Sequence, residues 1–228
     1  MLTRNDFRDK QDVKNLIELI KSASVKQTNI MEVCGTHTMA IAQAGIRQML
    51  PKNIRLISGP GCPVCVTPAE RIDDICRLSR RKDVIITTYG DMVRVPGTRK
   101  YISLDRSRME GADVRIVYSS MDALDIAADN PQSEVVFLGI GFETTAPASA
   151  AAIEAECRGI GNFSVFSLHK TVEPVMRTLL ESAEVRIDAF LLPGHVAVIT
   201  GTKGFRFLRR YRVPGVVSGF EPVDILKA

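Results

Sequence analysis

Cysteine is the residue type with the most reactive chemistry in this chain, and three of its five cysteines lie in two short motifs. The first motif is Cys34-Gly-Thr-His37-Thr, directly after an apolar run. A thiolate is a soft metal ligand and a nucleophile, and a helix N-terminus stabilises its charge. Thr36 or Thr38 can cap such a helix. Cys34 is therefore a candidate metal ligand with His37 beside it, and a buried structural cysteine is the alternative.

The second motif is Gly59-Pro-Gly-Cys62-Pro-Val-Cys65. The C-x-x-C spacing suits both a redox dithiol and a pair of metal ligands. Thr67-Pro-Ala-Glu70 follows and predicts a capping box with proline at the first helical position. Cys62 and Cys65 are thus expected just before a helix N-terminus, where thiolates are favoured.

Two further motifs carry acid–base groups. Glu143 lies in Gly139-Ile-Gly-Phe-Glu-Thr-Thr-Ala-Pro147, which lacks the lysine of a phosphate-binding Walker loop. Thr144 or Thr145 can cap the following helix, and a solvated Glu143 beside a helix cap is the alternative reading. Thr36, Thr144 and Thr145 are also candidate cofactor-binding residues. His195 lies in Pro-Gly-His and His169 in His-Lys, so all three histidines of the chain follow apolar runs.

The remaining cysteines, Cys76 and Cys157, fall within helical stretches. Buried, unreactive cysteines are common in helices that pack on a core. Core packing is therefore the prediction for both.

Short apolar runs rich in Val, Ile and Phe alternate with amphipathic stretches, which predicts parallel β-sheets flanked by helices. The predicted strands are 29–33, 54–58, 83–88, 114–118, 134–140, 163–168, 187–192 and 213–217. The clearest helices are 11–23, 38–50, 68–81, 121–129, 145–157 and 172–183. All the motifs lie where strands end, and ligands bind at that edge of parallel sheets.

The number of strands fits one sheet or two. We predict an N-terminal helical segment (1–28) and two similar α/β domains (29–120 and 121–228) that face each other across a cleft. A (β/α)8 barrel is disfavoured because such barrels typically need about 250 residues. Pro222 predicts a helix start close to Ala228, so we expect the chain to continue beyond that residue.

The overall composition of the chain argues against several classes of protein. The 30 basic and 26 acidic residues give a net charge of +4 without a basic cluster rich in aromatics, so nucleic acid is not an expected partner. The first residues lack the apolar segment of a secretory signal, and no apolar run approaches the roughly 20 residues that cross a membrane. We expect a cytoplasmic protein without a membrane partner, whose odd number of cysteines act as ligands, redox groups or buried thiols.

Taken together, the motifs resemble one known family. Residues 34–38, 59–65, 141–147, 193–195 and Gly-Phe-Glu-Pro at 219–222 are similar in identity and order to the HypD family of hydrogenase maturation factors. The resemblance runs from about residue 30 to the last residue.

That resemblance implies a metallocentre assembly scaffold with two α/β domains, and leaves open whether it also acts as an enzyme. With the small chaperone HypC it would hold iron while the Fe(CN)2CO unit of [NiFe]-hydrogenases is built, with cyanide coming from HypE. The unit would then pass to the hydrogenase large subunit. Cys34 corresponds to the iron ligand, and Cys62 and Cys65 to a redox-active pair. His37, Glu143 and His195 correspond to residues lining the family's cleft.

The resemblance also implies a [4Fe–4S] cluster in a cysteine-rich C-terminal region, and we expect this chain not to hold that cluster. Cys76 and Cys157 are too few to replace four thiolate ligands. Two other functions fit the residues alone. One is a thiol–disulfide oxidoreductase built on Cys62 and Cys65, and the other is a zinc-dependent hydrolase.

Overall fold

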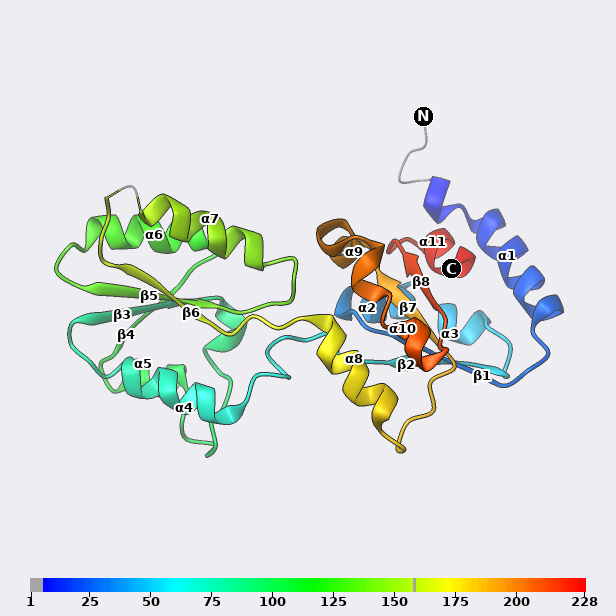
Figure 1. Cartoon of the computed structure of the whole chain (residues 1–228), viewed down its shortest axis with the longest axis horizontal. Helices are drawn as coiled ribbons and strands as arrows, with labels where there is room; N and C mark the ends of the chain where they lie inside the picture. The colour runs from blue at the N-terminus through cyan, green and yellow to red at the C-terminus, as the bar shows by residue number, and fades with distance from the viewer. Residues whose placement is uncertain (1–5, 158) are drawn as a thin grey trace. The chain divides into compact units, whose positions relative to one another are not determined.

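The computed structural model describes residues 6–157 and 159–228. Contacts divide the chain into two compact units, of which the first is discontinuous in sequence. Unit 1 comprises Met1–Cys62 and Thr171–Ala228, and unit 2 comprises Pro63–Lys170. Each unit is an α/β domain around its own sheet (Figure 1).

The sheet of unit 1 has four parallel strands in the order β2-β1-β7-β8. Its strands are β1 (Thr28–Glu32), β2 (Ile54–Ser58), β7 (Ala189–Pro193) and β8 (Gly215–Ser218). Its helical segments are η1 (Asp6–Arg8), α1 (Lys10–Ala23), α2 (Gly35–Gln43), α3 (Ile46–Met49), α8 (Val172–Glu181), α9 (Gly194–Thr200), η3 (Thr202–Phe205), α10 (Leu208–Tyr211) and α11 (Pro222–Lys227).

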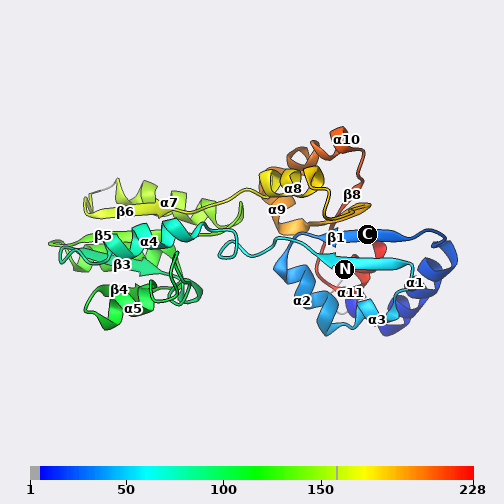
Figure 2. The same cartoon turned by 90° about the horizontal axis from the view of Figure 1, so that it is seen from below.

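Helices cover both faces of this sheet. Helices α8, α9 and α10 lie on one face, and α2, α3 and α11 lie on the other (Figure 2). On the second face Ile41, Ile46 and Leu191 form a buried apolar core with residues of α1 and α11. The apolar stripes of these helices therefore pack against this face of the sheet.

Unit 2 repeats this architecture with a sheet in the order β4-β3-β5-β6, again all parallel. Its strands are β3 (Val84–Thr88), β4 (Asp113–Ile116), β5 (Glu134–Gly139) and β6 (Phe163–Ser167). Its helical segments are α4 (Ala69–Leu78), η2 (Gly90–Met92), α5 (Leu104–Met109), α6 (Ser120–Asp129) and α7 (Ala146–Glu156).

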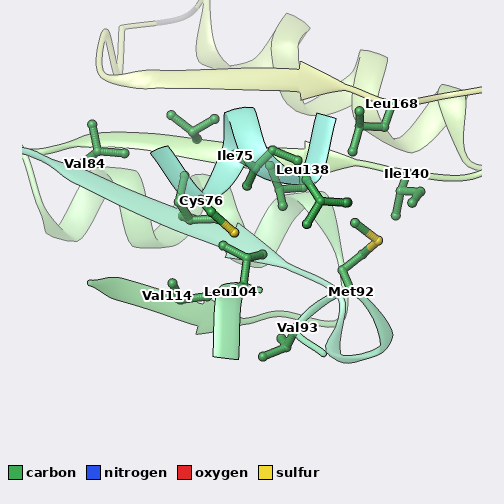
Figure 3. Packing of buried hydrophobic residues seen from close by; sticks show 13 residues of the cluster. Ile75, Cys76, Val84, Met92, Val93, Leu104, Val114, Leu138, Ile140 and Leu168 are labelled. Carbon is green, nitrogen blue, oxygen red and sulfur yellow. The ribbon is translucent and has the colours of Figure 1, made fainter. Parts of the chain in front are cut away.

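The central strands of unit 2 are buried on both faces, as a parallel sheet between two helical layers requires. Val136 and Leu138 belong to a core shared with α4 and α5. Figure 3 shows Leu138 of this core with Ile75 of α4 and Leu104 of α5. Val135 and Phe137 alternate with them and pack against α6 and α7 on the other face. The continuous apolar run of β5 is thus explained by burial on both sides.

All eight predicted strands are confirmed, with ends shifted by a few residues. The predicted α/β class with parallel sheets is likewise confirmed. The units, however, do not follow the predicted division near residue 120. Strand β7 pairs with β1, so residues 171–228 complete the sheet that begins at residue 28.

Several helix predictions need correction. The stretch 38–50 is two helices, because Gly45 adopts a left-handed backbone between α2 and α3. Helices α5, α9 and α10 were not predicted; each has at most seven residues and too few turns for a clear periodic pattern. The helix start at Pro222 is confirmed. None of the helices among the described residues is long and apolar enough to cross a membrane.

Candidate functional site

Each strand of the unit 1 sheet ends in one of the motifs singled out from the sequence. Cys34 follows β1, Gly59-Pro-Gly follows β2, Gly194-His195 follows β7 and Gly219-Phe220 follows β8. Since all four strands are parallel, these four loops lie at one edge of the sheet. The sheet therefore gathers segments separated by more than 180 residues into one candidate site.

Cys34 is the N-terminal cap residue of α2 and is buried. Its sulfur lies 3.9 Å from Nε2 of His195, which comes from the loop after β7. The thiol therefore has a polar partner and a helix N-terminus beside it. Cys34 therefore differs from a cysteine that packs only against apolar side chains.

His37 lies one turn into α2 and is fully buried. Its Nε2 lies 2.8 Å from the carbonyl oxygen of Gly219, and because a carbonyl only accepts, Nε2 carries the proton. The other ring nitrogen, Nδ1, is buried without a hydrogen-bond partner among the described residues. Burial lowers the pKa of His37, the hydrogen bond to Gly219 opposes that shift, and the nearby His195 adds to it, so the pKa lies below its ordinary value.

Phe220 packs against both histidine rings. Its centroid is 4.6 Å from that of His37 and 5.1 Å from that of His195. The aromatic ring holds the two imidazoles in place and limits water access to them. Sequence analysis did not assign Phe220 a role, although it lies in the Gly-Phe-Glu-Pro motif.

Gly61 brings the C-x-x-C loop against the Cys34 loop. A Cβ at this position would lie 2.4 Å from the backbone nitrogen of Gly35 and 2.8 Å from Cα of Cys34. No side chain fits in that space, so only glycine allows the two loops to touch. Cys62 is the next residue and is exposed.

A buried carboxylate supports the same edge. Glu32, the last residue of β1, is 0% exposed and accepts hydrogen bonds from Thr38 at 2.8 Å and Arg47 at 3.2 Å. Arg47 also donates to Ser58 at the end of β2. Burial raises the pKa of Glu32, while Ser58, Thr38 and Arg47 oppose that rise. Glu32 thereby connects β1, α2, α3 and β2 directly behind Cys34.

Removing this carboxylate should destabilise unit 1. We expect Glu32→Ala to lower the free energy of unfolding by about 2–3 kcal/mol, less than for a fully buried pair because Arg47 is partly exposed. Urea unfolding followed by circular dichroism measures the change. Asp113→Ala breaks an exposed pair with Arg115 and should cost under about 1 kcal/mol. Equal losses for the two variants would contradict the supporting role of Glu32.

Unit 2 carries the other predicted site residues. Glu143, Thr144 and Thr145 lie in the turn between β5 and α7, and all three are partly buried. His169 follows β6, where Ser167 and Ser149 lie 3.0 and 3.3 Å from its ring nitrogens. The structure thus places these residues at the carboxyl edge of the unit 2 sheet. Their convergence with Cys34 stays a prediction.

His169 should give unit 2 a pH-dependent stability. Burial lowers its pKa, so the unfolded chain, with a histidine pKa of about 6.5, binds the proton more readily. Neutral His169 contributes to the stability of the folded state above about pH 6.5. That contribution is lost as the pH falls through the lowered pKa that His169 has in the folded protein. Urea midpoints across this range should depend less on pH in His169→Gln. The neighbouring substitution Lys170→Gln should keep the wild-type dependence, and an unchanged profile in His169→Gln would contradict the assignment.

The predicted helix-capping roles of the threonines need correction. Thr38 donates to Glu32 and Thr145 donates to the carbonyl of Phe142, so neither caps its helix through its side chain. The capping box at Thr67 is absent, because Thr67 donates to the carbonyl of Pro63 and α4 begins after Pro68. Thr36 is exposed and likewise caps nothing.

Cys76 is buried in α4 as predicted, and burial raises the pKa of its thiol. Cys157 is exposed at the end of α7, so its predicted core packing is wrong. Cys65 is exposed as well and belongs to unit 2, so the C-x-x-C spans the point where the chain passes from one unit to the other. Cys34, Cys76 and Cys157 are free thiols.

Comparison with known proteins gives the family. The family model named HypD, described as "Hydrogenase formation hypA family", matches residues 11–228. This chain belongs to the HypD family. The chain is 46% identical to "Hydrogenase maturation factor HypD2" of Bradyrhizobium diazoefficiens, covering 98% of this chain and 61% of that protein. It is 45% identical to "Hydrogenase maturation factor HypD" of Escherichia coli, with 98% and 62% covered. The corresponding protein of Cupriavidus necator is 45% identical, with 98% and 61% covered.

These relatives carry the name of hydrogenase maturation factors. The chain spans about three fifths of the length of the curated relatives it matches. Within that length, the predicted resemblance of the five motifs to the HypD family is confirmed.

Sequence reasoning missed Glu32 and Phe220 in this HypD-family site. A signal for Glu32 was present, because a carboxylate interrupts the otherwise apolar segment that leads to Cys34. Its partner Arg47 lies 15 residues further on, in a helix whose orientation only the fold supplies.

Proposed function

We propose that this chain is an assembly scaffold that holds iron through Cys34 while the Fe(CN)2CO unit of [NiFe]-hydrogenase is built. Cys34 carries the proposal, because its sulfur lies at a helix N-terminus beside His195 in a member of the HypD family. In this proposal HypC shares the iron, HypE delivers cyanide, and the finished unit passes to the hydrogenase large subunit.

An assembly site needs few protein ligands, because cyanide and CO must occupy the remaining coordination positions. Among the described residues no group of three or more His, Cys, Asp or Glu side chains could hold a metal ion. That fits iron held as cargo by one thiolate, with a further ligand from HypC. A resident zinc of the kind that a hydrolase uses needs at least three protein ligands, and the described residues offer no such set.

The neighbours of Cys34 have distinct proposed roles. Helix α2 begins at Gly35, and its backbone N–H groups favour negative charge, which suits a thiolate and bound cyanide. His37 keeps an unprotonated nitrogen because Gly219 fixes its tautomer, a common arrangement for histidines that bind a metal or accept a proton. Phe220 keeps the surroundings apolar.

Cys62 and Cys65 are proposed to exchange electrons with the iron chemistry as a dithiol. Both residues are exposed, and thiol–disulfide exchange requires sulfur atoms that a partner can reach. In this proposal the [4Fe–4S] cluster that the family resemblance implies is not held by residues 1–228. The proposed location of the protein is the cytoplasm.

Infrared spectroscopy of the chain purified with HypC and HypE tests the proposal. Bands in the cyanide and CO stretching regions, together with bound iron, are the expected result. Their absence from a folded complex would refute the scaffold role.

The exposed thiols support one other function, a thiol–disulfide oxidoreductase. An oxidoreductase would catalyse the reduction of a disulfide substrate in the absence of iron. The variant Cys62→Ala would lose this activity. Such turnover without iron-dependent infrared bands would favour this second function over the scaffold.

A further inference from the structure

Strand β8 forms an open edge of the unit 1 sheet in the described part of the chain, because only β7 pairs with it. The carbonyl oxygen of Pro214 accepts from the backbone nitrogen of Phe190 at 2.9 Å, which fixes the alternation along β8. Val216 and Ser218 then direct their backbone groups to β7, and Gly215 and Val217 direct theirs outward. The edge thus offers backbone donors and acceptors to another strand.

The two faces of this edge differ in chemistry. Val216 is 45% exposed and lines an apolar cavity of 580 Å³, together with residues of α1 and α11. Val217 points to the opposite face, as does Gly215, whose backbone packs against Leu208 of α10. One face is therefore apolar, and the other adjoins η3 and α10.

That second face is strongly basic. Five cations lie within ten residues, and all are exposed: Lys203, Arg206, Arg209, Arg210 and Arg212. None of the five forms an ion pair with a described residue, whereas the nearby Arg177 is paired with Glu173. The segment 202–212 itself contains no acidic residue. In the described part of unit 1 these five cations are thus not neutralised by an acidic residue of the segment itself or by an ion-pair partner.

We propose that this β8 edge surface, made of Gly215–Val217 and the five cations, binds an extended segment of a partner protein with alternating apolar and acidic side chains. Side chains alternate between the faces of an added strand. Apolar side chains would then continue the cavity beside Val216, and acidic ones would meet the arginines beside Val217. The partner's side chains must alternate between apolar and acidic because the two faces of the β8 edge are apolar and basic.

A nucleic acid is a less suitable ligand than an acidic peptide for these five cations. Single strands bind through aromatic stacking as well as through phosphate contacts. The aromatic residues of this segment are engaged, since Tyr211 donates to Glu181 and the guanidinium of Arg177 covers the rings of Phe207 and Tyr211. The outward backbone groups of β8 also match a peptide strand and not a phosphate chain.

Fluorescence anisotropy with a labelled peptide of alternating Val and Glu tests the proposal on the intact chain. Saturable binding that weakens with added salt is expected. Arg209→Glu with Arg210→Glu should weaken it at least about tenfold, since charge pairs at an interface also fix register. Val217→Pro removes one outward N–H from the edge without removing a bond to β7, and it should weaken binding while circular dichroism stays unchanged.

Matched controls separate a specific surface from general charge. Arg94→Glu with Arg108→Glu alters two exposed arginines of unit 2 by the same total charge and should leave peptide affinity within about twofold. A Val–Lys peptide should not bind. The proposal is overturned if the Val–Glu peptide does not bind, or if the two double variants lose peptide affinity equally. It is also overturned if Val217→Pro leaves peptide affinity unchanged and a thymidine oligonucleotide binds as tightly as the peptide.

Discussion

Cys34→Ala is expected to abolish retention of iron and of the Fe(CN)2CO unit while leaving both units folded. The sulfur is the soft donor that the proposed site needs, and no nearby described side chain replaces it. The cavity left by one sulfur atom should cost only about 1 kcal/mol of stability. Iron analysis and infrared spectroscopy of the complex with HypC measure the loss, and circular dichroism verifies the fold.

The matched control for this variant is Cys157→Ala. Cys157 is a free thiol at the exposed end of α7 in unit 2, far along the chain from the motifs of unit 1. Its removal should leave iron content and infrared bands unchanged. If Cys34→Ala retained the bands of wild-type protein, the assignment of Cys34 as the iron ligand would be wrong.

Gly61→Ala should have the next largest effect. The added methyl would lie 2.4 Å from the backbone nitrogen of Gly35, and backbone cannot move aside as a flexible side chain can. We expect unit 1 to lose about 2–4 kcal/mol of stability, or its Cys34 loop to move away from the loop after β2. Either outcome should also lower iron retention.

Thermal unfolding and alkylation of Cys34 distinguish these outcomes. Cys34 is 7% exposed, so iodoacetamide should modify it slowly in wild-type protein and faster if the loop moves. Gly90→Ala is the control, because its methyl would meet only Ile116 at 3.6 Å. Wild-type stability together with wild-type alkylation of Gly61→Ala would contradict the tight contact between the loops.

The strands and the positions of the motif residues were predictable from local sequence. Runs of Val, Ile and Phe of strand length identify buried strands, and parallel strands place the following loops at one edge. The residue pattern alone therefore assigns Cys34 and His195 to strand ends. Their contact at 3.9 Å was not predictable in this way, because it joins residues 161 positions apart.

The position of β7 between β1 and β8 in the sheet could not be predicted from the sequence. Parallel pairing needs crossovers of a dozen residues or more, so neighbouring strands carry no local turn signal. The predicted boundary near residue 120 assumed that each unit was continuous. The exposure of Cys157 was missed for another reason, since α7 is so rich in alanine that its buried and exposed faces look alike.

The discontinuity of unit 1 has a consequence for biosynthesis. Pro63–Lys170 is contiguous, so unit 2 can fold as soon as the ribosome has released it. The central strand β7 and the carbonyl of Gly219 that orients His37 emerge later in translation than all of unit 2. A nascent chain therefore exposes the thiol of Cys34 before His195 has been synthesised, and the arrangement of Cys34, His37 and His195 is complete only once the ribosome has passed the codon for Gly219.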